Sequence, residues 1–330
     1  MIKTSIQNTV LFMVSIVSFF IISELCFRFY TSFTNIYDIE MYKYAKELKM
    51  KSEITDLLHE HKPNSEKELM DVSISINNIG LRHNNELENK KVNEKRIVVL
   101  GSSITMGWGV PYDSIFTTLL NDRLNEDRLE NYYQIFNLGV GNYNTYLQDI
   151  LFKNKVDKLK PDKVILHYFI NDAEIIEHKK YNFFINNSLL IAFLSVRIKQ
   201  FFISQDTKYS NIGEYYLDIY SENNEGWMQA KKSILNMKNL CKRKGLDFLC
   251  LLQPDLHDLG YQSDQYKCHL LIQDFLENKN IKYYDLFDDF HNKYNLNSYE
   301  LWIQKDDPHP NQKGHQLMYE SLYKYLTNYK

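Results

Sequence analysis

Two short motifs, far apart in the chain, hold the residue types that nucleophilic catalysis needs. Ser103 follows a β-branched apolar run, and the segment 306–311 reads DDPHPN. A hydroxyl nucleophile needs a base to take its proton and an acid to orient that base. Ser103, His309 and Asp306 fit these three roles if the fold brings the motifs together. Asp307 is an alternative acid, because the sequence alone does not separate two neighbouring carboxylates.

The elements that must position these residues are strands alternating with helices from residue 96 onward. Apolar runs predict buried strands at 96–100, 134–138, 163–168, 247–252 and 281–286. Helical patterns cover 113–128, 145–159, 227–244, 264–278 and 312–328. This alternation predicts an α/β fold, in which helices cover both faces of a parallel sheet.

Three of the candidate residues lie just past the ends of predicted strands. Ser103 follows the first strand, Gly141 the second and Asn171 the third. Ligands bind at the carboxyl ends of the strands in such sheets. We therefore expect the three residues to belong to one site.

Four sequence blocks, taken together, resemble the SGNH or GDSL-like hydrolase family over about residues 96–330. The resemblance implies a three-layer α/β/α sandwich with a parallel five-stranded sheet, the flavodoxin-like SGNH fold. No Gly-x-Ser-x-Gly elbow is present, which argues against the α/β-hydrolase fold. In chain order the blocks are Gly101-Ser102-Ser103, the segment 137–145 (NLGVGNYNT), Asn171-Asp172 and the segment 306–309 (DDPH).

The resemblance implies a role for each matching residue. Ser103 would be the nucleophile, His309 the general base and Asp306 the acid that orients it. The oxyanion hole would use the backbone N–H of Ser103, a backbone N–H at Gly141 or Asn142, and the side chain of Asn171. No cofactor and no metal ion are expected.

Three positions depart from the family pattern. Ser102 replaces the usual Asp beside the nucleophile, and Phe169 stands where the third block usually begins with Gly. Gly141-Asn142 reverses the usual order of a small residue followed by Gly. None of these departures removes Ser103 or His309.

The N-terminal segment is long and apolar enough to be a membrane helix. Residues 9–23 carry no charge, and apolar residues continue to Phe29 after Glu24. A helix over residues 9–29 would be about 31 Å long, the thickness of one bilayer core. An uncleaved single-pass anchor is favoured over a signal peptide, because no small-x-small cleavage site follows. A buried core helix is the third alternative, and the catalytic domain is expected outside the cytoplasm.

We divide the chain into an anchor (1–30), a pre-domain segment and linker (31–95) and a catalytic domain (96–330). Residues 38–61 are expected to be helical, and the alternation in 71–76 (DVSISI) predicts a strand. The segment 77–82, which ends at Arg82, resembles a pre-domain strap near the cleft of membrane-anchored family members.

For most of the remaining histidines and for the cysteines, a structural interpretation is favoured over a catalytic one. His167 is expected to pack in the core, and His59 and His61 to face solvent. His257 follows the fourth strand and could line the cleft. Disulfides 241–268 and 250–268 are alternatives to free thiols, which are favoured. The apolar segment 183–202 is expected to be a packed helix, a lid or, least favoured, a second span.

The favoured function is a serine esterase or O-acyltransferase that acts on small esters, acetyl-type and carbohydrate-linked by family resemblance. The partners expected are this ester and the membrane. Nucleic acid is not expected, because the net charge is −3. One alternative is an inactive glycan-binding accessory protein of envelope polysaccharide assembly. A flavodoxin-like nucleotide binder is disfavoured, because the Gly-rich phosphate loop is missing.

Overall fold

The computed structural model describes residues 2–84, 86–126, 132–176, 183–204 and 208–328. The chain divides into two compact units. The larger unit comprises Lys46–His178 and Tyr209–Lys330, and the smaller comprises Met1–Ala45 and Lys179–Lys208. Each unit is described by itself below.

The larger unit is built on a five-stranded parallel sheet, as the sequence predicts. The strand order is β6-β5-β7-β8-β9. The first strand of this sheet in chain order, β5, therefore lies between β6 and β7. Each predicted strand is present, with bounds that differ by a few residues. The strands are β5 (Glu94–Gly101), β6 (Tyr132–Gly139), β7 (Lys163–Phe169), β8 (Asp247–Gln253) and β9 (Tyr283–Asp285).

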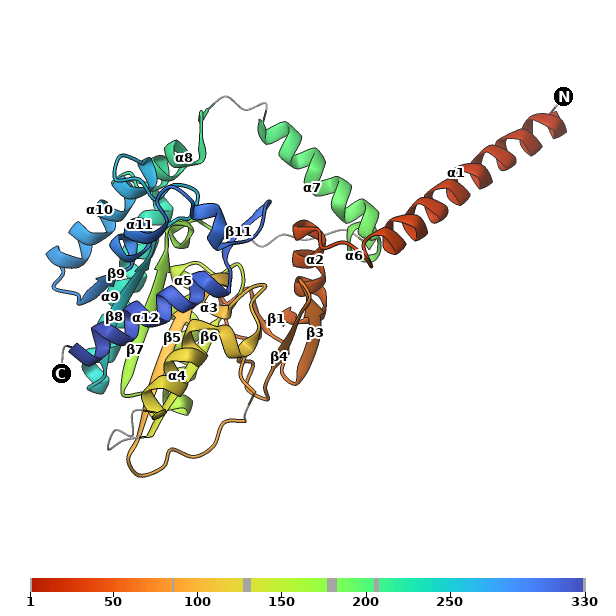
Figure 1. Ribbon diagram of the computed structural model, residues 1–330. Coiled ribbons are helices and arrows are strands. Elements are labelled where there is room, and N and C mark those ends of the chain that lie inside the picture. The colour runs from red at the N-terminus through yellow and green to blue at the C-terminus, as the bar shows by residue number, and fades with distance from the viewer. Residues whose placement is uncertain (1, 85, 127–131, 177–182, 205–207, 329–330) are drawn as a thin grey trace. The chain divides into compact units, whose positions relative to one another are not determined.

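Helices cover both faces of this sheet and complete the three-layer α/β/α sandwich. Val98 and Leu100 of β5 point into one apolar cluster, while Ile97 and Val99 point into the other. Helices α4 (Phe116–Glu126) and α12 (Gln312–Asn328) cross one face of the sheet in Figure 1. The first cluster includes α5 (Thr145–Leu159), α9 (Glu225–Lys244) and α10 (Asp264–Asn278), with α8 (Ile212–Ile219) beside them. The second includes α4 (Phe116–Glu126), α11 (Phe287–Tyr294) and α12 (Gln312–Asn328).

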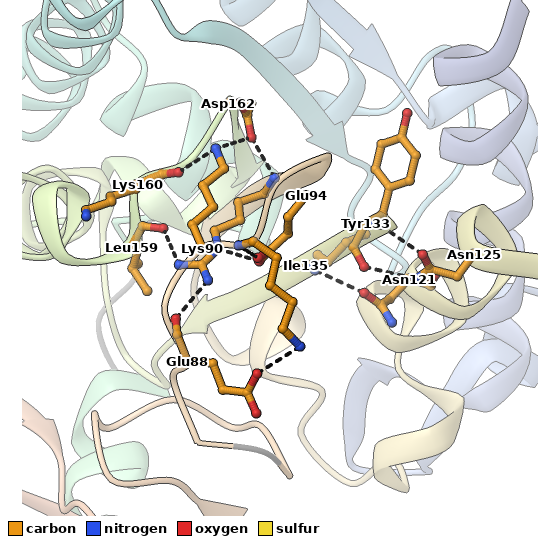
Figure 2. A network of polar contacts seen from close by, with 12 residues as sticks. Glu88, Lys90, Glu94, Asn121, Asn125, Tyr133, Ile135, Leu159, Lys160 and Asp162 are labelled. Atoms are coloured by element: carbon orange, nitrogen blue, oxygen red, sulfur yellow. Dashed lines mark hydrogen bonds and ion pairs between the residues drawn. The ribbon is translucent and has the colours of Figure 1, made fainter. Parts of the chain in front are cut away.

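The outer edge of β6 is covered by side chains of α4. The backbone N–H of Tyr133 donates to the side chain of Asn125, which also donates to the Tyr133 carbonyl. The N–H of Ile135 donates to Asn121 (Figure 2). Unpaired edge strands are prone to pair with other chains, so this cover protects the sheet.

A buried ion pair lies at the start of β5, and its arginine also contacts the linker that precedes the strand. The guanidinium of Arg96 lies 2.5 Å from Glu94, and both side chains are almost fully buried. Arg96 also donates to the carbonyl groups of Leu159 and Glu88 (Figure 2). Removing one partner of such a pair leaves an uncompensated buried charge, which typically costs about 3–5 kcal/mol.

The pre-domain segment forms two small hairpins, which corrects the expectation of helix through residue 61. Helix α2 (Tyr37–Glu47) ends early, and β1 (Lys49–Lys51) then pairs antiparallel with β2 (His59–His61). Strands of three residues are too short to show an alternating pattern. The strand predicted at 71–76 is confirmed as β4 (Val72–Ile76), which pairs with β3 (Ser65–Leu69).

The smaller unit contains one helix that is long and apolar enough to cross a membrane. This helix is α1 (Ile2–Tyr30), and its segment Ser5–Tyr30 is the candidate membrane span among the described residues. The segment predicted as a packed helix, a lid or a second span forms α6 (Phe183–Asn187) and α7 (Leu189–Ser204). Helix α7 packs against α1, where the carboxylate of Glu24 accepts the backbone N–H groups of Leu189 and Leu190. The segment is therefore helical, and α7 packs on α1 within the smaller unit.

The cysteines are free thiols, as favoured from the sequence. Cys241, Cys250 and Cys268 are buried, and Cys26 is exposed on α1. Neither candidate disulfide is formed.

Candidate active site

The candidate nucleophile begins a short helix directly after the central strand. Ser103 is the first residue of α3 (Ser103–Met106). A Cβ atom at Gly139 would lie 2.2 Å from the backbone nitrogen of Met106, and one at Gly101 would lie 1.8 Å from Thr105 Oγ1. Both distances are far below van der Waals contact. Glycine at these two positions therefore lets α3 lie against the sheet and sets where Ser103 points.

Ser103 and His309 meet as the sequence predicts. Ser103 Oγ lies 2.8 Å from Nε2 of His309. His309 lies on β11 (Asp307–Pro310), which pairs with β10 (Trp302–Gln304). On the other side of the ring, Nδ1 of His309 lies 2.5 Å from Oδ1 of Asp307. Because a carboxylate only accepts, Nδ1 carries the proton and Nε2 is free to accept from the hydroxyl.

The acid that contacts the histidine is Asp307, which corrects the expectation of Asp306. Asp307 is fully buried, and its Oδ1 also accepts the backbone N–H of His309 at 3.1 Å. Asp306 is exposed and precedes the strand. Residues two apart on a strand share a face, so the side chain of Asp307 lies beside that of His309.

Trp108 is a contributor that the sequence reasoning missed. Its indole Nε1 donates to Oδ2 of Asp307 at 2.9 Å, in a buried position. Its backbone N–H donates to the carbonyl of Ser103 at 3.0 Å. The loop after α3 thus links the nucleophile to the acid. Only the closeness of a tryptophan to Ser103 in sequence could have drawn attention to it.

Arg82 stabilises the end of α3, which agrees with the expected strap near the cleft. The buried guanidinium donates to the carbonyl groups of Met106 (3.0 Å), Gly107 (2.5 Å) and Val110 (2.7 Å). Met106 is the last residue of α3, and Gly107 and Val110 lie in the loop that follows it. Helix ends leave carbonyl groups without partners in the helix, so a donor is needed here. The contact holds the helix that carries Ser103.

Three hydrogen-bond donors follow three adjacent strands at the carboxyl edge of the sheet. They are the backbone N–H of Ser103 after β5, that of Asn142 after β6, and the side-chain amide of Asn171 after β7. Within the described part of the chain, no acceptor is found for any of the three. None of the three residues is fully buried, and Asn142 is exposed, so these donors are accessible to a negatively charged ligand atom.

Asn142 resolves the reversed order of Gly141-Asn142. Its φ is +65°, in the left-handed region that glycine adopts most readily and asparagine tolerates. The left-handed backbone at this position is therefore formed without a glycine.

Asn171 lies in a one-turn helix, η2 (Ile170–Ala173), that a buried carboxyl group supports. Oδ2 of Asp172 accepts the backbone N–H of Phe169 at 3.2 Å and the amide of Gln148 at 3.1 Å. Burial raises the pKa of Asp172 to about 8. Phe169 has a φ of −121°, which any residue adopts, so glycine is not required at this departure from the family pattern.

The Nδ1 atom of His257 contacts a carboxylate as that of His309 does, but no nucleophile among the described residues lies at the other nitrogen of the His257 ring. Its Nδ1 lies 2.6 Å from Oδ1 of Asp255, which raises the pKa of His257. Its ring lies edge-on to Trp302, and no hydroxyl group in the described residues bonds to it. An Asp-x-His pair alone therefore does not mark the site.

Two other predictions about histidines have opposite outcomes. His167 packs in the core as predicted, between Thr105 and Gln253. The solvent-facing positions predicted for His59 and His61 are wrong. His61 is buried, and Nε2 of His59 lies 3.2 Å from the carbonyl oxygen of Gly141. Among the described residues, no cluster of His, Cys, Asp and Glu could hold a metal ion.

No family model and no curated protein matches the chain. Solved structures similar to it include a two-domain esterase active on acetylated mannans, with 14% identity and a TM-score of 0.44 over 71% of this chain. The chain spans about half (49%) of that esterase.

Two further similar structures are spanned almost completely. One is an acetyl xylan esterase, with 15% identity and a TM-score of 0.46 over 70% of this chain and 99% of the other. Another is a putative lipolytic protein of the G-D-S-L family from Desulfitobacterium hafniense, with 15% identity and a TM-score of 0.43 over 70% and 98%. Because likeness at this level does not extend to activity, the function has to be inferred from the side chains of this chain.

Proposed function

We propose that the chain is a serine esterase or O-acyltransferase that works through an acyl-Ser103 intermediate. The observation that carries the proposal is the continuous contact from Ser103 Oγ to His309 Nε2 (2.8 Å) and from His309 Nδ1 to Asp307 Oδ1 (2.5 Å). This chain of contacts has the form of a catalytic triad.

The reaction has two halves. In the first, His309 takes the proton of Ser103 as Oγ attacks the ester carbonyl, and then returns it to the leaving alkoxide. In the second, water or another hydroxyl gives its proton to His309 and attacks the acyl carbon, and His309 returns that proton to Ser103 Oγ as the bond between Oγ and the acyl carbon breaks. Asp307 orients the imidazole and stabilises its positive charge in both halves.

The negative charge of each tetrahedral intermediate would be held by the N–H groups of Ser103 and Asn142 and the amide of Asn171. Donors of this kind act most strongly on the charge that develops in the transition state, which is why they accelerate the reaction. One such donor is typically worth about 3–4 kcal/mol.

The resemblance of the sequence motifs to the SGNH family suggests acetyl-type esters, carbohydrate-linked, as substrates. Acetylated xylan and mannan, on which two of the similar esterases act, are the first polymers to test. A hydrolase releases acetate from them in water. An acyltransferase instead moves the acetyl group to an added sugar hydroxyl, and the two products distinguish these alternatives.

The apolar helix α1 would anchor the chain in a membrane as a single span, with the catalytic unit outside the cytoplasm. The most apolar stretch of 18 residues within Ser5–Tyr30 has a mean hydropathy of 2.4, and none of its residues is buried in the structure. Resistance to carbonate extraction would support an anchor. Recovery of a shortened, soluble chain would instead indicate a cleaved signal sequence.

The proposed activity is tested by labelling the full chain, in detergent, with a fluorophosphonate. We expect the label on Ser103 by mass spectrometry, and none in the Ser103→Ala variant. The same variant should lose turnover of p-nitrophenyl acetate while keeping its unfolding midpoint. Absence of label on folded wild-type protein would overturn the proposal.

A further inference from the structure

The β1–β2 hairpin of the pre-domain segment contacts the loop that carries a proposed oxyanion donor. Lys49 Nζ donates to the carbonyl oxygen of Gly141 at 2.6 Å. Nε2 of His59 lies 3.2 Å from the same oxygen. Two side chains from a segment about ninety residues upstream therefore hold one carbonyl group of the site.

The rest of this contact fixes the hairpin and the loop to each other. The hydroxyl of Tyr143 donates to the carbonyl of His59, and the two rings lie edge to face, 5.1 Å apart. Because burial and the charge of Lys49 lower the pKa of His59 to about 3, its imidazole is neutral. A neutral imidazole contacts a carbonyl oxygen with its N–H, so Nε2 of His59 is the donor.

The hairpin also contacts other parts of the larger unit, so the loop is not its only support. Glu60 of β2 accepts the hydroxyl of Ser52 at 2.7 Å and lies 3.6 Å from Lys155 of α5. Nδ1 of His61 lies 3.3 Å from the carbonyl of Gly80. The hairpin is thus a supported element against which the loop can be positioned.

The held carbonyl determines where the next N–H points. No cis peptide bond occurs in the described chain, so the N–H of Asn142 points opposite to the carbonyl of Gly141. Lys49 and His59 occupy the carbonyl side of this peptide. The N–H side is left without an acceptor in the described residues, as an oxyanion donor requires.

We propose that Lys49 and His59 are positioning residues of the oxyanion hole, and that the pre-domain hairpin is part of the active site. This inference rests on the proposed serine acyl transfer. Hydrogen bonds to the carbonyl side of a peptide also polarise it, which strengthens its N–H as a donor. The two residues therefore act on the transition state through Asn142 and do not touch the substrate.

The test measures kcat and KM of the full chain in detergent, with p-nitrophenyl acetate as substrate. Lys49→Met removes the donor and keeps most of the side-chain volume. We expect kcat to fall about 10- to 100-fold with KM changed less than about twofold, because a transition-state contact is weakened. Lys51→Met, at an exposed lysine of the same strand, is the matched control and should behave as wild type.

A second pair of variants separates positioning from packing. His59→Leu removes the donor, whereas His59→Gln keeps an N–H donor at a similar reach. We expect His59→Leu to lower kcat and His59→Gln to restore most of it, with the unfolding midpoints of both recorded. A loss of kcat that is equal in the two variants would indicate a packing role and overturn the inference.

Two further outcomes distinguish this inference from the proposed function. If the wild-type chain turns over ester and Lys49→Met matches it, positioning by Lys49 is wrong while the proposed function stands. If the wild-type chain neither reacts with the fluorophosphonate nor turns over ester, the proposed function is wrong, and this inference is wrong with it.

Discussion

Oδ1 of Asp307 accepts two hydrogen bonds from a single residue, His309, one from Nδ1 of the ring and one from the backbone N–H. The two contacts fix both the direction of the ring and the backbone that carries it. The second oxygen of Asp307 accepts from Trp108, so both oxygens of this buried carboxylate are paired. The arrangement identifies the acid by geometry, and it leads directly to a mutational test.

Asp307→Asn should remove most of the activity, whereas Asp306→Asn should not. An amide at 307 favours the wrong tautomer of His309, and such a change in a triad lowers kcat by about 10³- to 10⁴-fold. Asp306 is exposed, so its variant should stay within about twofold of wild type. Steady-state turnover of p-nitrophenyl acetate measures both. A large loss at Asp306 with none at Asp307 would contradict the geometry.

Asn171→Ala should separate activity from stability. We expect kcat to fall about 10²- to 10³-fold with little change in KM, because one proposed oxyanion donor is removed. Oδ1 of Asn171 is buried without a partner, and removing such an atom does not destabilise the fold. The unfolding midpoint should therefore be unchanged or higher. An unchanged kcat would remove Asn171 from the oxyanion hole.

Substitutions at Asn142 should follow the preferences of its left-handed backbone. Asn142→Gly should keep the fold and most of the activity, because glycine adopts a φ of +65° readily. Asn142→Val should lower the free energy of unfolding by about 1–2 kcal/mol, because a β-branched residue is strained there. Urea unfolding and ester turnover of the two variants provide the comparison. Equal behaviour of the two would show that the loop does not require this conformation.

Asp172→Asn should make the protein more stable at high pH. Burial raises the pKa of Asp172 to about 8 in the folded chain, whereas an unfolded Asp titrates near 3.9. The folded state therefore binds the proton more tightly. The contribution of this binding to the free energy of unfolding is fully present below about pH 4 and is lost as pH rises to about 8.

Wild type should lose about 3–4 kcal/mol more of its free energy of unfolding than Asp172→Asn between pH 5 and pH 8, measured by urea unfolding. Asp306→Asn, which changes an exposed carboxyl group, is the control and should follow wild type. Parallel curves for wild type and Asp172→Asn would show that Asp172 ionises normally.

Local patterns were enough to predict the framework of this protein. Buried strands appear as continuous apolar runs and helices as a 3.6-residue period, and both patterns are local in sequence. The helices predicted at 145–159, 264–278 and 312–328 have these bounds in α5, α10 and α12. The motifs at strand ends also placed Ser103 and His309, which meet at 2.8 Å.

The pre-domain segment shows where local patterns fail. Strands β1 and β2 have three residues each, so they carry no readable period. His59 appeared polar and solvent-facing because its partner, the carbonyl of Gly141, lies 82 positions away. Trp108 was likewise undetected as a support of the site, because its contact depends on how α3 ends. Arg82 was expected only as part of a strap near the cleft, and its contacts to the end of α3 were not predicted.

The sequence by itself determined the order of strands and helices, the nucleophile and base to be tested, and an apolar helix near the N-terminus. Only the tertiary structure decided between Asp306 and Asp307, because that choice depends on the register of β11 relative to Ser103. It alone also showed that Asn142 adopts a left-handed backbone and that Lys49 holds the peptide before it. Periodicity is a property of neighbouring residues, whereas hydrogen bonds between distant segments exist only once the chain has folded.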